Sequence, residues 1–418
     1  MRVKLSVIPF FVLFPGYFLY QWAALHGFGD FFLGGYLNEV SVLLCVVFFF
    51  AWVFAGARLP RKMNTIDLCF LVFIAWFAGV VLVHAALGTA PVVTKSHAAA
   101  WLQMLACYLV TRHLAYEHLK TLSTGSVWLL ATVVLWAAQM DFTRLVVALA
   151  GGESEHSATY QSLARAFLVT AAMALLVWKS KLQRWFGYLV CLMVLFILGA
   201  RSELLGGVIL ALVYELALSE RKAVAVASMA VFSVLGVLLL YIYFDALAEL
   251  FPESRFLALL VRGAEDGSVL ERAQQQASAW SAVLHSPILG DYGHYETGAS
   301  VGAYSHNWLS AWVDLGLVGL LLFVVLQCAA VWTAVQVLRA SSSNRNSDAH
   351  RLAALALGMV TMFVVFAVFA KSFTDAGVAT AVGIVASLRA RDINNGRRVG
   401  MRLRSRFSKA DACRSPLT

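Results

Sequence analysis

The chain has 418 residues, of which 61% are hydrophobic and only 13% are charged. Its mean hydropathy is +0.77, whereas a typical soluble domain is about half apolar and about a quarter charged. This composition excludes a water-soluble globular domain, because such a domain could not bury so much apolar surface. It predicts an all-α protein that crosses a membrane many times.

Apolar runs follow one another along the chain. Because a helix needs roughly 20 residues to cross a bilayer and several runs are shorter, we expect about twelve transmembrane helices, within a range of about ten to thirteen. The runs lie at 5–25, 37–56, 65–87, 98–111, 122–140, 161–178, 185–200, 203–218, 222–244, 309–338, 352–370 and 374–388.

Lys and Arg occur at every second connection between these runs, which predicts that those connections are cytoplasmic. The opposite connections, and the long segment 245–305 above all, are then external, with both termini inside. The first run is too long for a cleaved signal peptide and is expected to be an anchor. The basic residues that set this orientation are Arg58, Arg61, Lys62, Arg112, Lys120, Lys179, Lys181, Arg184, Arg221, Lys222, Arg339, Arg345 and Arg351.

This pattern divides the chain into four parts. Residues 1–244 contain the first nine transmembrane helices, 245–305 form an external helical segment, 306–388 contain the last three helices, and 389–418 form a cytoplasmic tail. The net charge of +9 lies largely in this tail, where eight Arg and one Lys face two Asp. A basic tail beside a membrane is expected to contact anionic lipid headgroups, so we expect no nucleic-acid partner. The six cysteines form neither a disulfide framework nor a paired metal motif.

Two helices are expected in the external segment. The first, from about Asp245 to Val261, is amphipathic, is interrupted at 251–252, and is expected to lie along the membrane surface. The second begins with a capping box formed by Ser268 and Glu271, which places Arg272 in its first turn. It should end near His285, because a proline follows at 287. Residues 290–305 contain four glycines and are expected to be turn-rich.

The chain re-enters the membrane after this segment. His306, Ser310 and Asp314 are spaced by four and are expected to share one helical face. Asp314 lies two turns from His306, about 12 Å along a regular helix, so the two should not form a contacting dyad. Gly316 and Gly319 should allow a neighbouring helix to approach closely.

Three charged or titratable residues lie where apolar runs meet the external side, and each has an ordinary structural interpretation. Arg201 could extend into the headgroups, Arg272 could be solvated, and His306 could be packed. Other external candidates are expected to be mostly solvated: Lys95, His97, Arg144, Arg165 and Lys371. A metal cluster of His285, His294, His306 and Glu296 is not supported, because these residues lack compact ligand spacing.

Three motifs in this order resemble the O-antigen ligase and polymerase superfamily of bacterial envelope enzymes. The first is Leu198-Gly-Ala-Arg-Ser-Glu-Leu-Leu-Gly-Gly207, and the second is Ser268-Val-Leu-Glu-Arg272 followed by His285-Ser-Pro-Ile-Leu-Gly290. The third and most specific is Ser305-His-Asn-Trp-Leu309 with Asp314-Leu-Gly-Leu-Val-Gly-Leu320. The resemblance covers roughly residues 185–340. The chain departs from the family pattern at Ala200, Gln276 and Asp314, where Ser, Trp and Glu are common.

The resemblance implies a GT-C-like membrane glycosyltransferase without a metal or other cofactor. Its donor would be a glycan on undecaprenyl pyrophosphate, and its active site would face the periplasm from the bacterial inner membrane. Arg201 and Arg272 would bind the pyrophosphate, and His306 would be the general base. Asn307 and Asp314 would support them, and Lys95 or Lys371 could add positive charge.

Two other functions stay open at this point. A ligase would attach the glycan to a lipid A core sugar, and we favour it because the chain has a single modest external segment and a clear His-Asn motif. A polymerase would instead extend a polyprenyl-linked glycan with the same donor chemistry. A transporter of lipid-linked sugars would bind headgroups without catalysis, but the internal repeats expected of a transporter are not evident in the sequence.

Overall fold

The computed structural model describes residues 7–25, 35–54, 63–150, 160–251, 254–263, 267–297, 306–345 and 347–390. Within these ranges every regular element is a helix and no strand is present. The all-α fold class is therefore confirmed. The predicted basic tail lies outside the described residues from 391 onward.

Each apolar run predicted from the sequence coincides with a helix. The first half contains α1 (Ile8–Phe11), η2 (Val12–Gly16), α2 (Tyr17–Leu25), α3 (Tyr36–Phe54), α4 (Thr65–Leu87), α5 (Pro91–His113), α6 (Tyr116–Ala150), α7 (Tyr160–Ala174), α8 (Lys181–Ile197), α9 (Arg201–Leu218) and α10 (Lys222–Ile242). The second half contains α11 (Phe244–Leu250), α12 (Arg255–Arg262), α13 (Gly267–His285), η4 (His294–Thr297), α14 (Leu309–Ala340), η5 (Ser342–Asn344), α15 (Asp348–Phe369) and a last helix, Ala376–Ala390.

Five segments in the described ranges are long and apolar enough to cross a membrane: 65–87, 122–140, 222–242, 309–340 and 348–369. Three further apolar helices are shorter: Ile8–Ala24, Tyr36–Ala51 and Ala376–Ala390. The helices α7 and α8, with 15 and 17 residues, are also short. The chain is thus a polytopic membrane protein, with several helices shorter than a full span.

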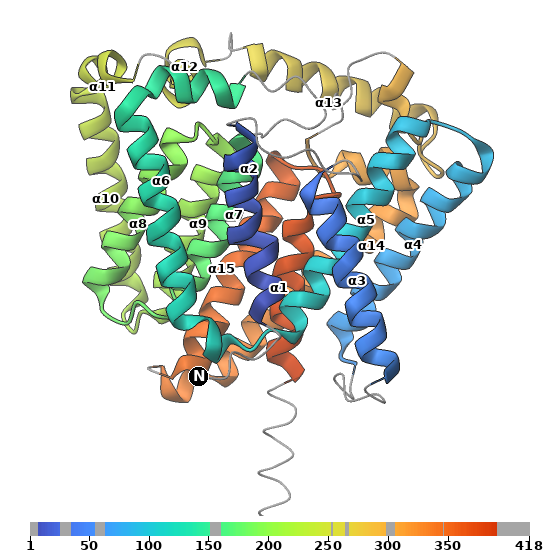
Figure 1. Cartoon of the computed structure of the whole chain (residues 1–418), viewed down its shortest axis with the longest axis horizontal. Coiled ribbons are helices and arrows are strands. Elements are labelled where there is room, and N and C mark those ends of the chain that lie inside the picture. Colours follow the sequence, from blue (N-terminus) through green and yellow to red (C-terminus); the bar gives the residue numbers. More distant parts are fainter. Residues whose placement is uncertain are drawn as a thin grey trace, which may run out of the picture.

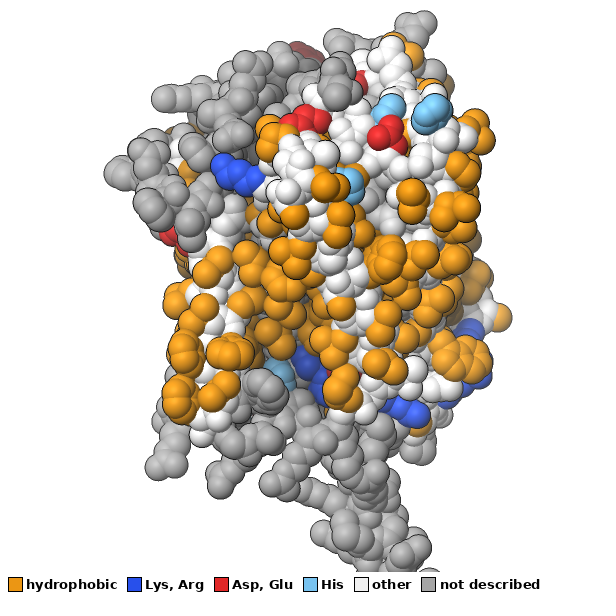
Figure 2. Space-filling view, turned by 90° about the vertical axis from the view of Figure 1, so that its right-hand side faces the viewer, with side chains coloured by type: hydrophobic (Ala, Val, Ile, Leu, Met, Phe, Trp, Pro, Cys, Tyr) orange, Lys and Arg blue, Asp and Glu red, His pale blue; other side chains and the backbone are white. Residues whose placement is uncertain are grey.

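The helices pack side by side, and α13 lies across one end of the bundle while the turn between α14 and α15 lies at the other (Figure 1). We call the first of these the α13 end. Hydrophobic side chains cover the middle of the face shown in Figure 2, and Lys and Arg gather toward the end opposite α13. Exposed apolar residues on α4 and α14 include Leu68, Leu82, Leu321 and Val325. Such a surface suits contact with lipid tails.

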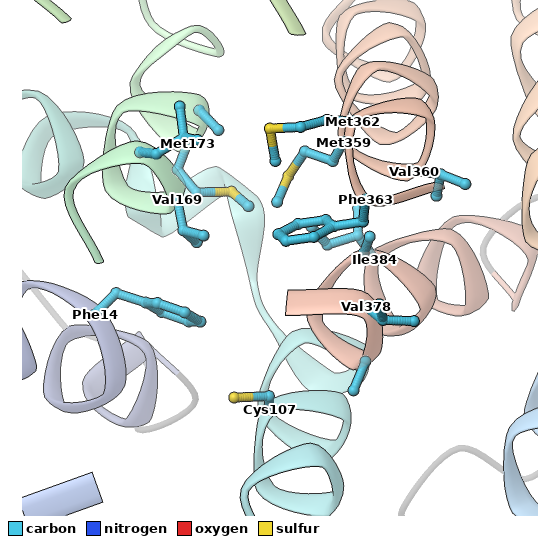
Figure 3. Packing of buried hydrophobic residues seen from close by; sticks show 14 of the residues in the cluster. Phe14, Cys107, Val169, Met173, Met359, Val360, Met362, Phe363, Val378 and Ile384 are labelled. Atoms are coloured by element: carbon cyan, nitrogen blue, oxygen red, sulfur yellow. The ribbon is translucent and has the colours of Figure 1, made fainter. Parts of the chain in front are cut away.

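Buried apolar side chains fill the interior of the bundle (Figure 3). The α9 and α15 helices come especially close at two glycines. A Cβ atom at Gly206 would lie 2.3 Å from the Phe366 ring, and one at Gly358 would lie 2.8 Å from a Leu210 methyl group. Small residues at these positions allow the two helices to pack closely, as in many membrane proteins.

Three of the basic residues that predicted the orientation are buried and bonded at the end opposite α13. Arg112 donates to Asp67 from both Nε (2.7 Å) and Nη2 (3.0 Å). Arg184 pairs with Glu215, and Arg351 donates to the Trp178 carbonyl (2.6 Å). These three arginines hold helices together as well as marking this end of the bundle.

The segment 244–285 forms the expected helices, and both α11, at Phe244, and α13, at Gly267, begin slightly earlier than expected. The amphipathic stretch is divided into α11 and α12, as its Pro-containing interruption predicts, and Phe251 and Phe256 both pack edge to face on Phe196 of α8. The α13 helix ends at His285 as predicted, but it begins at Gly267, before the predicted cap at Ser268, which places Arg272 in its second turn rather than its first. The predicted cap falls outside the description, because the Ser268 side chain is among the residues not described.

A backbone interlock joins the turn after α13 to a kink in α14. Gly316 has φ 68° and ψ −176° inside α14, which interrupts the helix there. The Asp291 N–H donates to the Val313 carbonyl (2.7 Å), and the Leu317 N–H donates to the Ile288 carbonyl (3.0 Å). The kink therefore leaves one carbonyl and one N–H of α14 without a partner inside the helix, and the turn 287–291 supplies both partners.

The kink also contacts a neighbouring helix. The Trp76 indole of α4 donates to the Leu315 carbonyl (3.1 Å), beside Gly319. The close approach expected at Gly319 is thus confirmed with α4. At Gly316 the expectation of a neighbouring helix is wrong, because the nearest atoms belong to the 287–291 turn, with the Ile288 carbonyl oxygen 2.6 Å from an added Cβ.

We expect Gly316→Ala to destabilise this region. An alanine there would need a left-handed backbone and would force its Cβ against the Ile288 and Leu289 carbonyls. Strain of this kind costs on the order of 1–3 kcal/mol. The measurement is thermal unfolding of the purified protein in detergent, with proteolysis of 286–297 as a local readout. Gly79→Ala in α4, where no atom lies within 4 Å of an added Cβ, is the control. Equal midpoints for the two variants would contradict the interlock.

Candidate functional site

The first sequence motif forms the turn between α8 and α9. Gly199 adopts φ 69°, and its N–H donates to the Phe196 carbonyl (3.0 Å), which ends α8. The next helix begins two residues later at Arg201, which is half-buried at the α13 end. The motif therefore places Arg201 and the following Glu203 in one helical turn.

Glu203 is fully buried and belongs to a cluster of four charged side chains at this end. Lys371 Nζ lies 3.0 Å from its Oε1 atom, and Arg165 Nη2 lies 3.4 Å from the same oxygen. Arg165 Nη1 also contacts Asp375 Oδ1 at 2.8 Å. This charged cluster, formed by Arg165, Glu203, Lys371 and Asp375, joins α7, α9 and the connection 371–375. Its two cations and two carboxylates balance in charge.

The same connection is bonded to the His-Asn motif. The Phe373 N–H donates to Ser310 Oγ (3.1 Å), and that hydroxyl donates to the Asn307 carbonyl (2.7 Å). The Asn307 side-chain oxygen accepts from the Leu309 N–H (3.0 Å) at the start of α14. Asn307 thus shapes the loop that carries His306.

His306 is half-buried just before α14. Burial, together with the positive charges of Arg272 and Lys371, lowers its pKa to about 4. The imidazole is therefore neutral at pH 7 and able to accept a proton. The structure thus brings two of the predicted cations, Arg272 and Lys371, within electrostatic reach of His306.

The α13 helix is held beside His306 by an aromatic and aliphatic cluster. Ala279, Ala282 and Val283 pack against Leu309 and Val313, the first residues of α14. The Trp280 ring lies 5.9 Å from the Trp308 ring and 6.3 Å from the Trp312 ring, measured between centroids. Arg272 itself is exposed on α13. Its guanidinium is thus available to an anionic ligand arriving from solution or from the membrane surface.

Asp314 belongs to a different group. It is 2% exposed, and it accepts from the Tyr295 hydroxyl (3.0 Å) and the Gly293 N–H (3.3 Å). His97 Nε2 of α5 lies 3.8 Å from the same carboxylate. Asp314 therefore anchors the turn 291–297.

The shared helical face predicted for His306 and Asp314 is wrong. The α14 helix begins at Leu309, so His306 lies in the preceding loop. Ser310 contacts the 371–375 connection, whereas Asp314 contacts the 291–297 turn. Residues 306–308 form a bend and turn instead of a helix, and there the Asn307 side chain accepts from the Leu309 N–H.

The remaining candidates differ in their surroundings. Lys95 is exposed on α5, as expected for a solvated residue. Lys371 and His97 are buried, and Arg165 is paired, so the expectation that most of these residues are solvated is wrong for these three. The Arg144 side chain and residue Ser305 lie outside the described residues.

Sequence reasoning gave no role to Glu203 or Asp375. Glu203 lies within the first motif, two residues after Arg201, and an acidic residue at the start of an apolar run is itself a signal of a polar partner. The partner could not be identified from the sequence, because Lys371 is 168 positions away along the chain.

We expect Glu203→Gln to destabilise the protein strongly. The substitution leaves Lys371 and Arg165 with one buried carboxylate instead of two. Breaking a buried ion pair from one side costs roughly 3–5 kcal/mol. The midpoint of thermal unfolding in detergent should fall, whereas the exposed control Glu249→Gln in α11 should change it little. A Glu203→Gln midpoint equal to that of the parent chain would contradict this account of the charged cluster.

Comparison with known families finds one match, to the family described as O-antigen ligase, over residues 186–324. This region contains Arg201, Glu203, Arg272, His306 and Asp314. A search of curated protein sequences finds no match. The family match confirms the resemblance predicted from the three motifs: residues 186–324, about a third of the chain, are similar to the O-antigen ligase family.

Proposed function

We propose that this protein is an O-antigen ligase, which transfers a glycan from undecaprenyl pyrophosphate to a sugar hydroxyl of the lipid A core. The reaction would take place at the periplasmic face of the bacterial inner membrane, at the α13 end. The observation that carries the proposal is the position of His306 near the charges of Arg272 and Lys371, with His306 and Arg272 both inside the region of the family match. This grouping supplies a neutral base beside positive charge.

Arg201 and Arg272 are assigned to the pyrophosphate of the donor. A guanidinium can donate two hydrogen bonds to phosphate oxygens and stays ionised next to lipid. Charge develops on the phosphate oxygen as the bond to the sugar breaks, and cations positioned there lower the barrier. The exposed position of Arg272 on α13 supports access by a lipid-borne anion.

His306 is assigned as the general base. The acceptor hydroxyl oxygen forms a bond to the anomeric carbon of the donor glycan, and the bond from that carbon to the phosphate oxygen breaks. The hydroxyl proton moves to the imidazole, and undecaprenyl pyrophosphate leaves as the anion. A base must be unprotonated to accept this proton, and the low pKa of His306 meets that requirement at pH 7.

We expect His306→Ala to abolish glycan transfer without loss of the folded protein. The test is complementation of a deletion strain, followed by electrophoresis of its lipopolysaccharide. The variant should give uncapped lipid A core and accumulated lipid-linked glycan. His285→Ala, at the exposed C-terminal end of α13, is the matched control and should restore capping.

The deletion strain also separates the alternatives. Loss of all capped species with accumulated lipid-linked polymer supports a ligase. Capping by single repeat units would instead assign the chain as a polymerase, and trapping of lipid-linked units in the cytoplasm would assign it as a transporter. Normal capping by the His306→Ala variant would contradict the general-base role.

The pH dependence of transfer tests the link between Arg272 and His306. Because the pKa of His306 lies at about 4, kcat/KM of the parent chain should be flat between about pH 5 and 7 and fall as the pH approaches that value. Arg272→Gln removes a neighbouring positive charge, so the pKa of His306 should rise and the acidic limb should move to higher pH. Lys95→Gln, on exposed α5 surface, should leave the limb unchanged. An unmoved limb in Arg272→Gln would contradict the electrostatic coupling.

A further inference from the structure

A cavity of 380 Å³ lies at the α13 end, beside the charged cluster. Its walls come from η2, α2, α3, α5, α7 and the last helix. Ligand sites for small molecules occupy roughly 300–1,000 Å³, so this cavity is at the smaller end of that range. Its size suits a compact ligand such as a single sugar ring better than a long polyprenyl chain.

Neutral hydrogen-bonding groups dominate the polar part of the wall. The amides of Gln21, Asn38, Gln103 and Gln161 all line the cavity. Gln21 is only 8% exposed, and its side-chain oxygen has no hydrogen-bond partner among the described residues. A buried amide oxygen without a partner costs stability, typically about 1–3 kcal/mol, unless a ligand or water donates to it. Hydroxyl groups are suitable donors.

Aromatic rings form another part of the wall. Tyr36 stacks between Tyr17 (6.0 Å between centroids, 19° between planes) and Tyr20 (5.0 Å, 15°), and all three line the cavity. Tyrosine combines an apolar ring with a polar hydroxyl. Sugars also combine apolar C–H faces with a rim of hydroxyls, so amides and tyrosines together match a sugar ring.

The charges around the cavity favour a neutral ligand. Arg165 lines the wall, but its guanidinium contacts Asp375 and Glu203. The cation is therefore compensated, and a pyrophosphate would find a carboxylate on each side of it. Hydroxyl groups can accept from the guanidinium or donate to the carboxylates without adding net charge.

The cavity is connected to the candidate reaction centre through Lys371. Its ammonium group donates to the side-chain oxygen of Gln161 in the cavity wall (2.7 Å) and pairs with Glu203. The 371–375 connection is also bonded to the loop that carries His306, through Phe373 and Ser310. A ligand in the cavity would thus lie one side chain away from the elements that hold the proposed base.

We propose that this cavity is a subsite for one neutral, hydroxyl-rich sugar unit of the substrates. The inference rests on the proposed function, since a glycosyltransferase has a glycan on its donor and on its acceptor. Both sources share the chemistry that the wall recognises. Because the side-chain oxygen of Gln21 has no partner among the described residues, we expect a substitution of Gln21 to weaken sugar binding in this cavity.

The test compares two identical substitutions of buried glutamines in the full chain, reconstituted in nanodiscs. Gln21→Leu removes the amide from the cavity. Gln327→Leu in α14 is the matched control, because Gln327 is 7% exposed, also has an unpartnered buried amide atom among the described residues, and does not line the cavity. Donor is lipid-linked glycan extracted from the deletion strain, and acceptor is its uncapped lipid A core.

We expect Gln21→Leu to raise one KM about tenfold, the equivalent of losing one hydrogen bond to the sugar, without lowering the thermal midpoint. A raised donor KM assigns the cavity to the donor glycan, and a raised acceptor KM assigns it to the core sugar. Gln327→Leu should change neither value. Unchanged KM values in Gln21→Leu, or the same increase in both variants, would overturn the proposal. If Gln21→Leu does not fold, Ala166→Leu narrows the cavity from its apolar wall and is judged by the same criteria.

A binding measurement separates this proposal from the proposed function. The probe is the free glycan released from the donor by mild acid, titrated into the parent chain and both variants and followed by saturation-transfer NMR. Binding that is lost in Gln21→Leu and kept in Gln327→Leu supports the cavity even if transfer is absent, in which case the ligase assignment alone fails. Transfer with equal glycan binding by all three chains would leave the ligase assignment intact and remove the subsite.

Discussion

The site at the α13 end depends on two backbone hydrogen bonds between the turn 287–291 and the kink at Gly316. A regular helix satisfies its own N–H and C=O groups, so it offers nothing for a second segment to bind. The left-handed Gly316 breaks that pattern and leaves the Val313 carbonyl and the Leu317 N–H to the turn. Because α13 immediately precedes this turn, the kink fixes where Arg272 lies relative to the loop of His306. Two motifs that are separate in the sequence thus become one unit.

The charged cluster holds together the part of the site that α7, α9 and the 371–375 connection form. Arg165 and Lys371 lie outside the matched region 186–324, whereas Glu203 lies inside it. The ion pairs therefore connect the family region to helices that the family match does not cover. Burying four charges is expensive, and the cost is limited here because the charges balance and each side chain has a bonded partner. Geometry at the site is maintained by contacts that span most of the chain.

Features that depend on a local sequence pattern could be predicted from the sequence. Hydrophobic runs predicted the helices, the proline after His285 predicted the end of α13, and the motifs predicted the family. The sequence alone could not predict the role of a residue when that role depends on a partner far away along the chain. The burial of Lys371 follows from Glu203, and the role of Asp314 follows from Tyr295. The late start of α14 was missed for another reason, because a spacing of four is helical only when the backbone is helical throughout.

Desolvation explains why positive charge is distributed unevenly at this end. Arg272 is exposed and can keep its charge at little cost, so it suits an anion. Arg165 and Lys371 line or adjoin an enclosed space, where an uncompensated cation would cost several kcal/mol, and both are paired with carboxylates. The outer side of the site therefore favours phosphate, and the enclosed side favours hydroxyl groups. A polyprenyl pyrophosphate glycan carries both chemistries in one molecule, joined at the anomeric carbon that the proposed base His306 must serve. Burial lowers the pKa of His306 and keeps this imidazole neutral at pH 7, and the charges of Arg272 and Lys371 act in the same direction.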